Sequence, residues 1–269
     1  MSTVLAENLR HPASPGPVLA NTGTITARNL RRLSRVPTQI ALATIQPILL
    51  VILFTYGIGG AVHVPGVTHY IDYLLPGAFV LAIGFGASQT GVAIAEDLAS
   101  GMIDRFRSLP ITSASVLAGR VAADAVRNLV VAGLMIAVGA AIGFRFHAGP
   151  AAALAAVALA VATGIAFSWL NLLLGIVVRD GETAGLAGLF PVIILTFTSS
   201  TLVPVATMPG WLQAFAKINP ITVIVGALRA LSLGGPTARP ISEALAWIGG
   251  LLLATIPAAI SRYRHATSA

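Results

Sequence analysis

The sequence predicts an all-α, polytopic membrane protein, a six-helix transmembrane bundle. Hydrophobic residues make up 56% of the 269 residues and charged residues only 9%, and the mean hydropathy is +0.88. Because a soluble domain carries roughly 25% charged residues, most of this chain's surface has to face lipid. The apolar residues also gather into runs of about 20 residues, the length that crosses the hydrocarbon core of a bilayer.

Six apolar runs follow one another along the chain, at residues 40–62, 74–95, 122–144, 151–178, 183–205 and 241–260. Pro47 interrupts the first run, which a bundle tolerates because neighbouring helices can satisfy the freed carbonyl. A further stretch, 221–233, has 13 residues and contains Arg229. It is too short to cross, so we expect an interfacial or re-entrant helix outside, before the last span; a seventh, tilted span is the alternative.

The basic residues predict the orientation. With six spans, five basic residues precede the first run, four lie between the second and third runs or at the start of the third, one follows the fourth and two follow the sixth, all on one side. Only Arg145, Lys217, Arg229 and Arg239 fall on the other side. The positive-inside rule therefore places both termini in the cytoplasm. We expect a cytoplasmic segment at 1–37, a six-span transmembrane domain at 38–264 and a short cytoplasmic tail at 265–269.

The sequence lacks the residues that several classes of function require. The chain has no cysteine, and its five histidines show no metal-ligand spacing, so no metal site is predicted. The only lysine, Lys217, follows no glycine-rich loop, so the chain lacks the P-loop of ATP-hydrolysing proteins. No catalytic constellation is present, and no cofactor is expected in this chain. The net charge of +7 is spread sparsely, which argues against nucleic acid as a partner.

The segment after the second run is the most polar part of the chain. Charged residues cluster there within twelve positions, with Met102, Ile103 and Phe106 among them: Glu96, Asp97, Asp104, Arg105 and Arg107. The pattern predicts a short amphipathic helix at the membrane surface that ends before Pro110. Thr112 or Ser113 can cap the following helix. A solvated loop and a docking surface for a partner fit this pattern equally well.

The segment before the first run carries a basic helix face. Four arginines recur at helical spacing on it: Arg28, Arg31, Arg32 and Arg35. Such a helix can lie in the interface against anionic lipid headgroups. The same charges also serve as ordinary positive-inside flanks of a membrane span.

Two segments together resemble type-2 (ABC-2 type) ABC exporter permeases, most closely the daunorubicin/doxorubicin-resistance group. The first is the cytoplasmic loop with Glu96, Gly101, Asp104, Arg105, Arg107 and Pro110. The second lies before the last span and contains Pro209, Trp211, Asn219, Pro220 and Arg229. One departure is Val223, where the common form has an aromatic residue. The resemblance covers residues 24–264.

The resemblance implies a transporter permease subunit that is not itself an enzyme. Two permeases, identical or sister chains, would pair and dock separate ATP-binding subunits, which bind ATP and Mg. The cargo would be a hydrophobic small molecule or lipid, such as a drug or antibiotic. The ATPase-coupling residues would be Glu96, Asp97, Gly101, Asp104, Arg105, Arg107 and Pro110, with a second contact at Arg179, Asp180 and Glu182.

The alternative is a gradient-driven secondary efflux carrier. Such a carrier needs carboxylates within the membrane. Five of the six runs have none in their middle, and Asp124 is expected near the cytoplasmic start of the third. There it would form an interfacial ion pair with Arg127; a substrate or coupling role is the alternative. Other polar residues in the runs could line a substrate pathway or join helices: Gln89, Asn171, Thr198, Ser199 and Thr201. Trp211 is expected to anchor at the headgroup level.

Overall fold

A computed structural model describes residues 37–62, 64, 66–100 and 113–268, together with residues 23 and 26. Every regular element in these ranges is a helix. In chain order they are α3 (Pro37–Leu53), the π-helical η1 (Phe54–Ile58), α4 (Tyr70–Ala99), α6 (Ser113–Ile142), α7 (Pro150–Val178), α8 (Gly181–Phe197), the 3₁₀ turn η2 (Val205–Thr207), α9 (Gly210–Ile218), α10 (Pro220–Leu233) and α11 (Ala238–Ser268). The predicted N-terminal helix with its four arginines lies outside the described residues.

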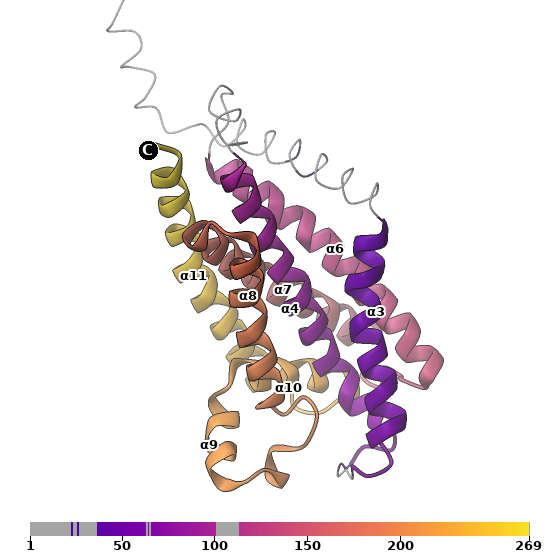
Figure 1. Ribbon diagram of the computed structural model, residues 1–269. Coiled ribbons are helices and arrows are strands. Elements are labelled where there is room, and N and C mark those ends of the chain that lie inside the picture. Colours follow the sequence, from indigo (N-terminus) through magenta and orange to yellow (C-terminus); the bar gives the residue numbers. More distant parts are fainter. Residues whose placement is uncertain are drawn as a thin grey trace, which may run out of the picture.

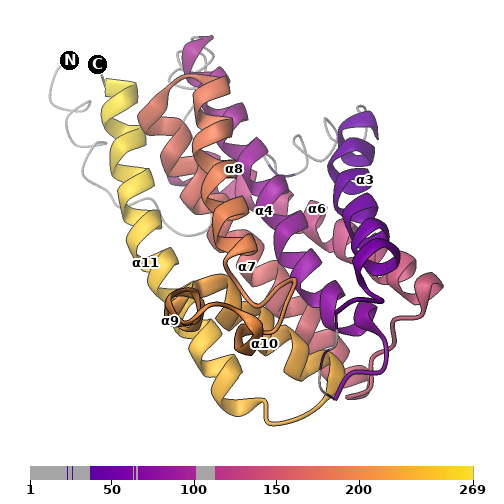
Figure 2. The same ribbon diagram turned by 60° about the horizontal axis from the view of Figure 1, so that its bottom comes forward.

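The long helices form one bundle that runs between two ends (Figures 1 and 2). We call the end where α4, α7 and α11 finish the C-terminal end. The connection from α7 to α8 also lies there. At the other end, here called the opposite end, α8 finishes, α9 and α10 follow, and α11 begins (Figure 1). Helices α4, α6, α7 and α11 are long and apolar enough to cross a membrane.

This confirms an all-α, multi-pass membrane bundle, whereas six spans remain a prediction. The first apolar run corresponds to α3 followed by the π-helical η1, and the fifth corresponds to α8, which has 17 residues. The pair α9 and α10 is bent by 72° at its break. Because this pair begins and ends at the same end of the bundle (Figure 1), its arrangement is re-entrant. The face of α10 with Ile221, Ile224, Val225 and Leu228 is buried in the core, so α10 is no surface helix.

Helix α4 lies at the centre. Its most apolar stretch is 78% buried, whereas that of α11 is 22% buried. It crosses α7 where two glycines meet: a Cβ added to Gly175 would lie 2.3 Å from the carbonyl oxygen of Gly91. Only residues without a side chain allow backbones to approach so closely. The outer flanks expose large apolar side chains such as Leu154 and Leu253, as lipid-facing helices do.

The fifth helix ends earlier than the sequence predicts. The apolar run extends to residue 205, but α8 stops at Phe197, and a turn follows. The hydroxyl of Thr198 donates to the carbonyl of Ile194 at 2.7 Å, and that of Ser199 to the carbonyl of Thr196 at 2.6 Å. These side chains compete with the helical hydrogen bonds. The predicted pathway residues Thr198, Ser199 and Thr201 therefore lie beyond the helix rather than inside it.

Candidate functional site

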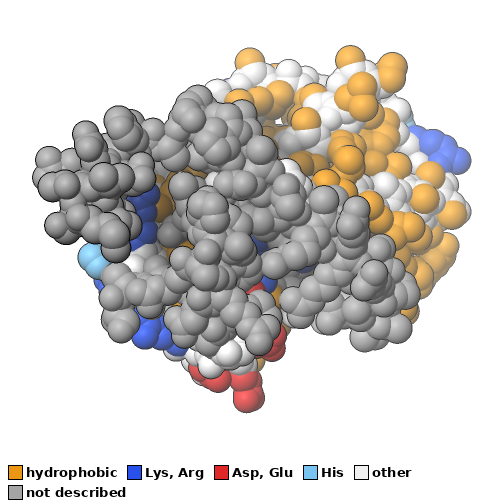
Figure 3. Space-filling model, turned by 90° about the horizontal axis from the view of Figure 1, so that it is seen from above, with side chains coloured by type: hydrophobic (Ala, Val, Ile, Leu, Met, Phe, Trp, Pro, Cys, Tyr) orange, Lys and Arg blue, Asp and Glu red, His pale blue; other side chains and the backbone are white. Residues whose placement is uncertain are grey.

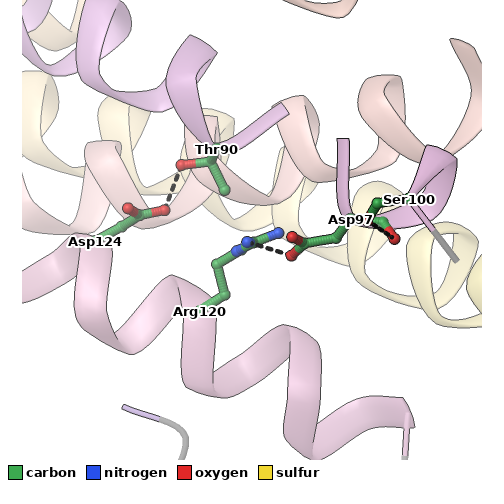
Figure 4. A network of polar contacts seen from close by, with 5 residues as sticks. All are labelled: Thr90, Asp97, Ser100, Arg120 and Asp124. Atoms are coloured by element: carbon green, nitrogen blue, oxygen red, sulfur yellow. Dashed lines mark hydrogen bonds and ion pairs between the residues drawn. The ribbon is translucent and has the colours of Figure 1, made fainter. Parts of the chain in front are cut away.

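An ion pair closes the C-terminal end of the bundle between α4 and α6. Arg120 Nη2 donates to Asp97 Oδ2 at 2.7 Å, and the two side chains are 15% and 20% exposed (Figure 4). Ser100, three residues after Asp97, donates its hydroxyl to the backbone carbonyl of Asp97 at 3.2 Å. Charge-assisted pairs of this length are among the stronger hydrogen bonds in proteins. Arg120 is one of the four basic residues counted between the second and third apolar runs or at the start of the third. Nothing in the sequence pointed to its partner Asp97, which lies 23 residues earlier in the chain.

The turn between α7 and α8 lies beside the end of α4. Arg179 ends α7 in the left-handed conformation, with φ at 60°. Asp180 then caps α8, because its carboxylate accepts the backbone N–H of Thr183 at 2.8 Å. Hydrogen bonding from the side chain of Thr183, and then from its backbone N–H, lowers the pKa of Asp180 below its ordinary value. A Cβ built on Gly181 would lie 3.2 Å from Cγ of Glu96, so Glu96 packs against this turn.

The structure thus brings together the predicted residues Glu96, Asp97, Asp180 and Glu182. Seen from this end, acidic side chains gather at one rim, and hydrophobic side chains gather on the opposite side of the view (Figure 3). The remaining coupling residues of the sequence analysis lie outside the described residues: Gly101, Asp104, Arg105, Arg107 and Pro110. Where the chain is described, no three His, Asp or Glu side chains gather as metal ligands would.

A second ion pair confirms the predicted pairing of Asp124 with Arg127 but is buried inside the bundle. Arg127 Nη1 and Asp124 Oδ1 are 2.9 Å apart, and both side chains are about nine-tenths buried. Thr90 of α4 donates to the other oxygen of Asp124 (Figure 4). We expected this pair at the membrane interface, but α6 begins at Ser113 and places it near the middle of the helix. At 1.5 Å per residue, Asp124 lies about 16 Å from the start of α6.

The two lone amides of the sequence analysis have different surroundings. Asn171 is 1% exposed, and its Nδ2 donates to the carbonyl of Phe167 at 2.9 Å. Its Oδ1 lies against Gly188 of α8, where a Cβ would clash. Gln89 instead faces out of the bundle from α4. The structure therefore does not join Gln89 and Asn171 in one pathway, and Asn171 lies where α7 and α8 pack.

The signature residues before the last span organise the re-entrant pair. Pro209 precedes the first turn of α9, and Trp211 is 76% exposed. Asn219 caps α10, since its Oδ1 accepts the N–H of Ile221 at 2.9 Å, and Pro220 occupies the first helical position. The amide of Asn219 also donates to the carbonyl of Leu195 at 2.8 Å, which links α10 to the end of α8.

Arg229 of α10 binds two other segments through neutral groups. Its Nε donates to the carbonyl of Tyr73 at 2.9 Å, and its Nη2 to the carbonyl of Thr201 at 3.0 Å. Its Nη1 donates to Ser200 Oγ at 3.2 Å. The guanidinium carbon lies 3.4 Å from the centre of the Tyr73 ring, a cation–π contact. Sequence patterns gave no signal for Tyr73, because nothing in the order of residues joins positions 73, 200 and 229.

Similar proteins cover nearly the whole chain. Residues 20–233 match the family described as ABC-2 type transporter. A daunorubicin resistance ABC transporter permease protein (DrrB1) of Streptomyces coeruleorubidus is 28% identical over 267 residues, covering 98% of this chain and 93% of the relative. A probable doxorubicin resistance ABC transporter permease protein (DrrC) of Mycobacterium tuberculosis is 30% identical over 250 residues, covering 90% of this chain and 88% of the relative. The chain belongs to the ABC-2 type transporter family and is a transmembrane permease subunit of an ABC exporter.

Proposed function

We propose that this permease exports an amphiphilic, mainly apolar compound, such as a drug, an antibiotic or a lipid, across the cytoplasmic membrane. The observation that carries the proposal is the nearly full-length similarity to permeases named for daunorubicin and doxorubicin resistance. The sequence supports a separate source of energy, because it has no P-loop. A partner subunit binds ATP and Mg, and two permeases pair side by side within the membrane.

The C-terminal end of the bundle is the docking side for the ATP-binding subunit. The acidic residues Glu96, Asp97, Asp180 and Glu182 lie together there and suit a basic partner surface. The segment 101–112 connects α4 to α6, and the Asp97–Arg120 pair joins the end of α4 to the start of α6. A push on this segment is therefore passed to both helices at once. The same assignment places both termini in the cytoplasm.

A gradient-driven carrier is the second candidate, and one observation favours it. Asp124 is a buried carboxylate near the middle of α6 rather than at its end, the position that ion-coupled carriers use. Its pairing with Arg127 and Thr90 supports a structural role. The two functions separate by energy source: export by an ATP-driven permease continues after a protonophore collapses the proton gradient and stops when ATP is depleted.

Affinity purification of the tagged chain in mild detergent tests the proposal. We expect a stoichiometric small protein with a P-loop to remain bound, and Asp97→Arg or Arg120→Asp to weaken its retention. The double variant, which swaps the charges of the pair, should restore it. Arg239→Glu is the matched control, since Arg239 pairs with Glu243 on the exposed surface of the opposite end. Vanadate-sensitive ATP hydrolysis by the chain alone, or no bound ATPase even under ATP-trapping conditions, would contradict the assignment.

A further inference from the structure

We propose that Arg229 is a positioning residue that holds the opposite end of the permease shut. This inference deepens the proposed function, because release of cargo requires that end to open. Arg229 and its contacts join three elements that are distant in sequence: the start of α4, the turn after α8, and α10. We call the group Tyr70, Tyr73, Ser200, Thr201 and Arg229 the Arg229 clasp.

The turn after α8 is held from both sides. On the side of α4, Tyr73 donates its hydroxyl to the carbonyl of Ser200 and Tyr70 donates to the carbonyl of Leu202, both at 2.7 Å. On the side of α10, Arg229 binds Ser200 and Thr201, and the hydroxyl of Thr222 accepts the N–H of Ser200 at 3.1 Å. The backbone of this turn is therefore bonded to both α4 and α10, and moving it away from either helix breaks hydrogen bonds.

The chemistry of the clasp calls for arginine. A guanidinium has five N–H groups in a rigid plane and can serve several acceptors at once, whereas an ammonium group is a compact point charge. Here three different nitrogens of Arg229 meet three acceptors on two segments, and its face lies on the Tyr73 ring. In the described part of the chain no ion pair joins Arg229 to a carboxylate. Partners that are neutral carbonyls and hydroxyls bind the cation without the full strength of an ion pair.

The held turn is also the wall of a small apolar cavity. The cavity lies between α3, α4 and the end of α8, and its lining includes Val51, Leu74, Ala78, Phe197 and Thr201. Its free volume is about 20 Å³, room for about one water molecule. The structure leaves little room at this point, and widening the cavity on the side of the 197–202 turn displaces that turn and breaks the clasp.

The test measures access to this cavity by cysteine labelling. The chain has no cysteine of its own, so Ala78→Cys, in the cavity wall, is a unique reporter. The full chain is placed in lipid nanodiscs and its labelling rate with a water-soluble maleimide is measured. Adding Arg229→Gln should raise the rate about tenfold or more, because it removes charged hydrogen bonds. Arg229→Lys should also raise it, since the charge is kept but the planar fork is lost.

Controls separate opening from general unfolding. Ala206→Cys, on the exposed 3₁₀ turn, should label equally fast with and without Arg229→Gln. Arg239→Gln, which removes an exposed arginine from the same end, should leave the rate at position 78 unchanged. If Arg229→Gln fails to insert, Tyr70→Phe and Tyr73→Phe decide, because each removes one hydroxyl bond and keeps its ring.

An unchanged rate at position 78 in Arg229→Gln, or in both phenylalanine variants where the glutamine variant does not insert, overturns the clasp. The measurement needs neither an ATPase nor cargo. The clasp can therefore fail while the exporter assignment stands, and the absence of a bound ATPase would not alter these labelling rates.

Discussion

At the scale of single residues, three arginines of this permease show how surroundings decide a role. Arg120 pairs with Asp97 at the C-terminal end, Arg127 pairs with Asp124 inside the bundle, and Arg229 binds carbonyls and an aromatic face. Counting charges along the sequence treats the three alike. Their partners lie on other helices or one helical turn away, so the fold rather than the residue type decides what each one holds.

The cap of α10 provides a prediction at this scale. Asn219→Ala should lower the free energy of unfolding by about 2 kcal/mol, because it removes both the cap on Ile221 and the bond to Leu195. Asn219→Ser should cost about half as much, since serine caps a helix but is too short to reach Leu195. Denaturant titration in one detergent measures both. Equal losses in the two variants would show that the link between α10 and α8 contributes nothing.

The hydrogen bonds of Asp180 at the start of α8 are expected to depend on pH. Its pKa is lower in the folded protein than in the unfolded chain because the carboxylate accepts hydrogen bonds from Thr183. Its contribution is therefore complete above the unfolded pKa and is lost as the pH falls through the folded pKa. The amide resonance of Thr183, followed by NMR during acidification, should shift in that range. In Asp180→Asn, which keeps a capping oxygen without a charge, this titration should disappear; a titration that persists would assign it to another group.

At the scale of elements, glycines set how closely the central helices pack. Gly91 and Gly175 let α4 and α7 cross with their backbones in contact. Helix α8 ends at Phe197, and the hydroxyls of Thr198 and Ser199 bind carbonyls of its last turn. The early end of α8 leaves the turn that the Arg229 clasp holds.

The glycine crossing predicts the effect of one added methyl group. Gly175→Ala should destabilise the bundle by about 1–3 kcal/mol, since the new Cβ would meet backbone atoms that cannot yield cheaply. Gly133→Ala is the matched control, because nothing lies within 4 Å of its added Cβ. In a helix this change should stabilise by roughly 0.5–1 kcal/mol. Thermal unfolding of both variants in the same detergent checks the contrast, and equal melting temperatures would refute it.

At the scale of the whole molecule, the bundle has two chemically different ends. The C-terminal end gathers Glu96, Asp97 and the Asp180 turn, whereas the opposite end holds the re-entrant pair α9 and α10. An exporter that takes energy from one side and releases cargo on the other needs such an asymmetry. The large apolar side chains on the flanks between the two ends fit lipid.

Orientation is the prediction at this scale. A reporter fused after Arg264 should be active only as a cytoplasmic reporter, and one inserted after Thr207 only as an extracytoplasmic one, because the positive-inside rule and the bundle place them at different ends. Alkaline phosphatase and a fluorescent protein at each position provide the two readouts. Finding both reporters on the same side of the membrane would mean that the chain crosses it an even number of times between them, so the expected single crossing by α11 would be wrong.

The sequence by itself determined that this is a multi-pass helical membrane protein of the exporter-permease type, because hydropathy, charge asymmetry and local signatures are written in consecutive residues. The short helix expected at 221–233 is found as α10, because the residues that limit it are local in the sequence. Only the tertiary structure decided that α8 ends at Phe197, that Asp124 lies deep in the bundle, and that Arg229 meets Tyr73 across 156 positions. Such contacts depend on how closely helices pack and on which carbonyls are left free, and neither property is encoded by the spacing of residues within one run.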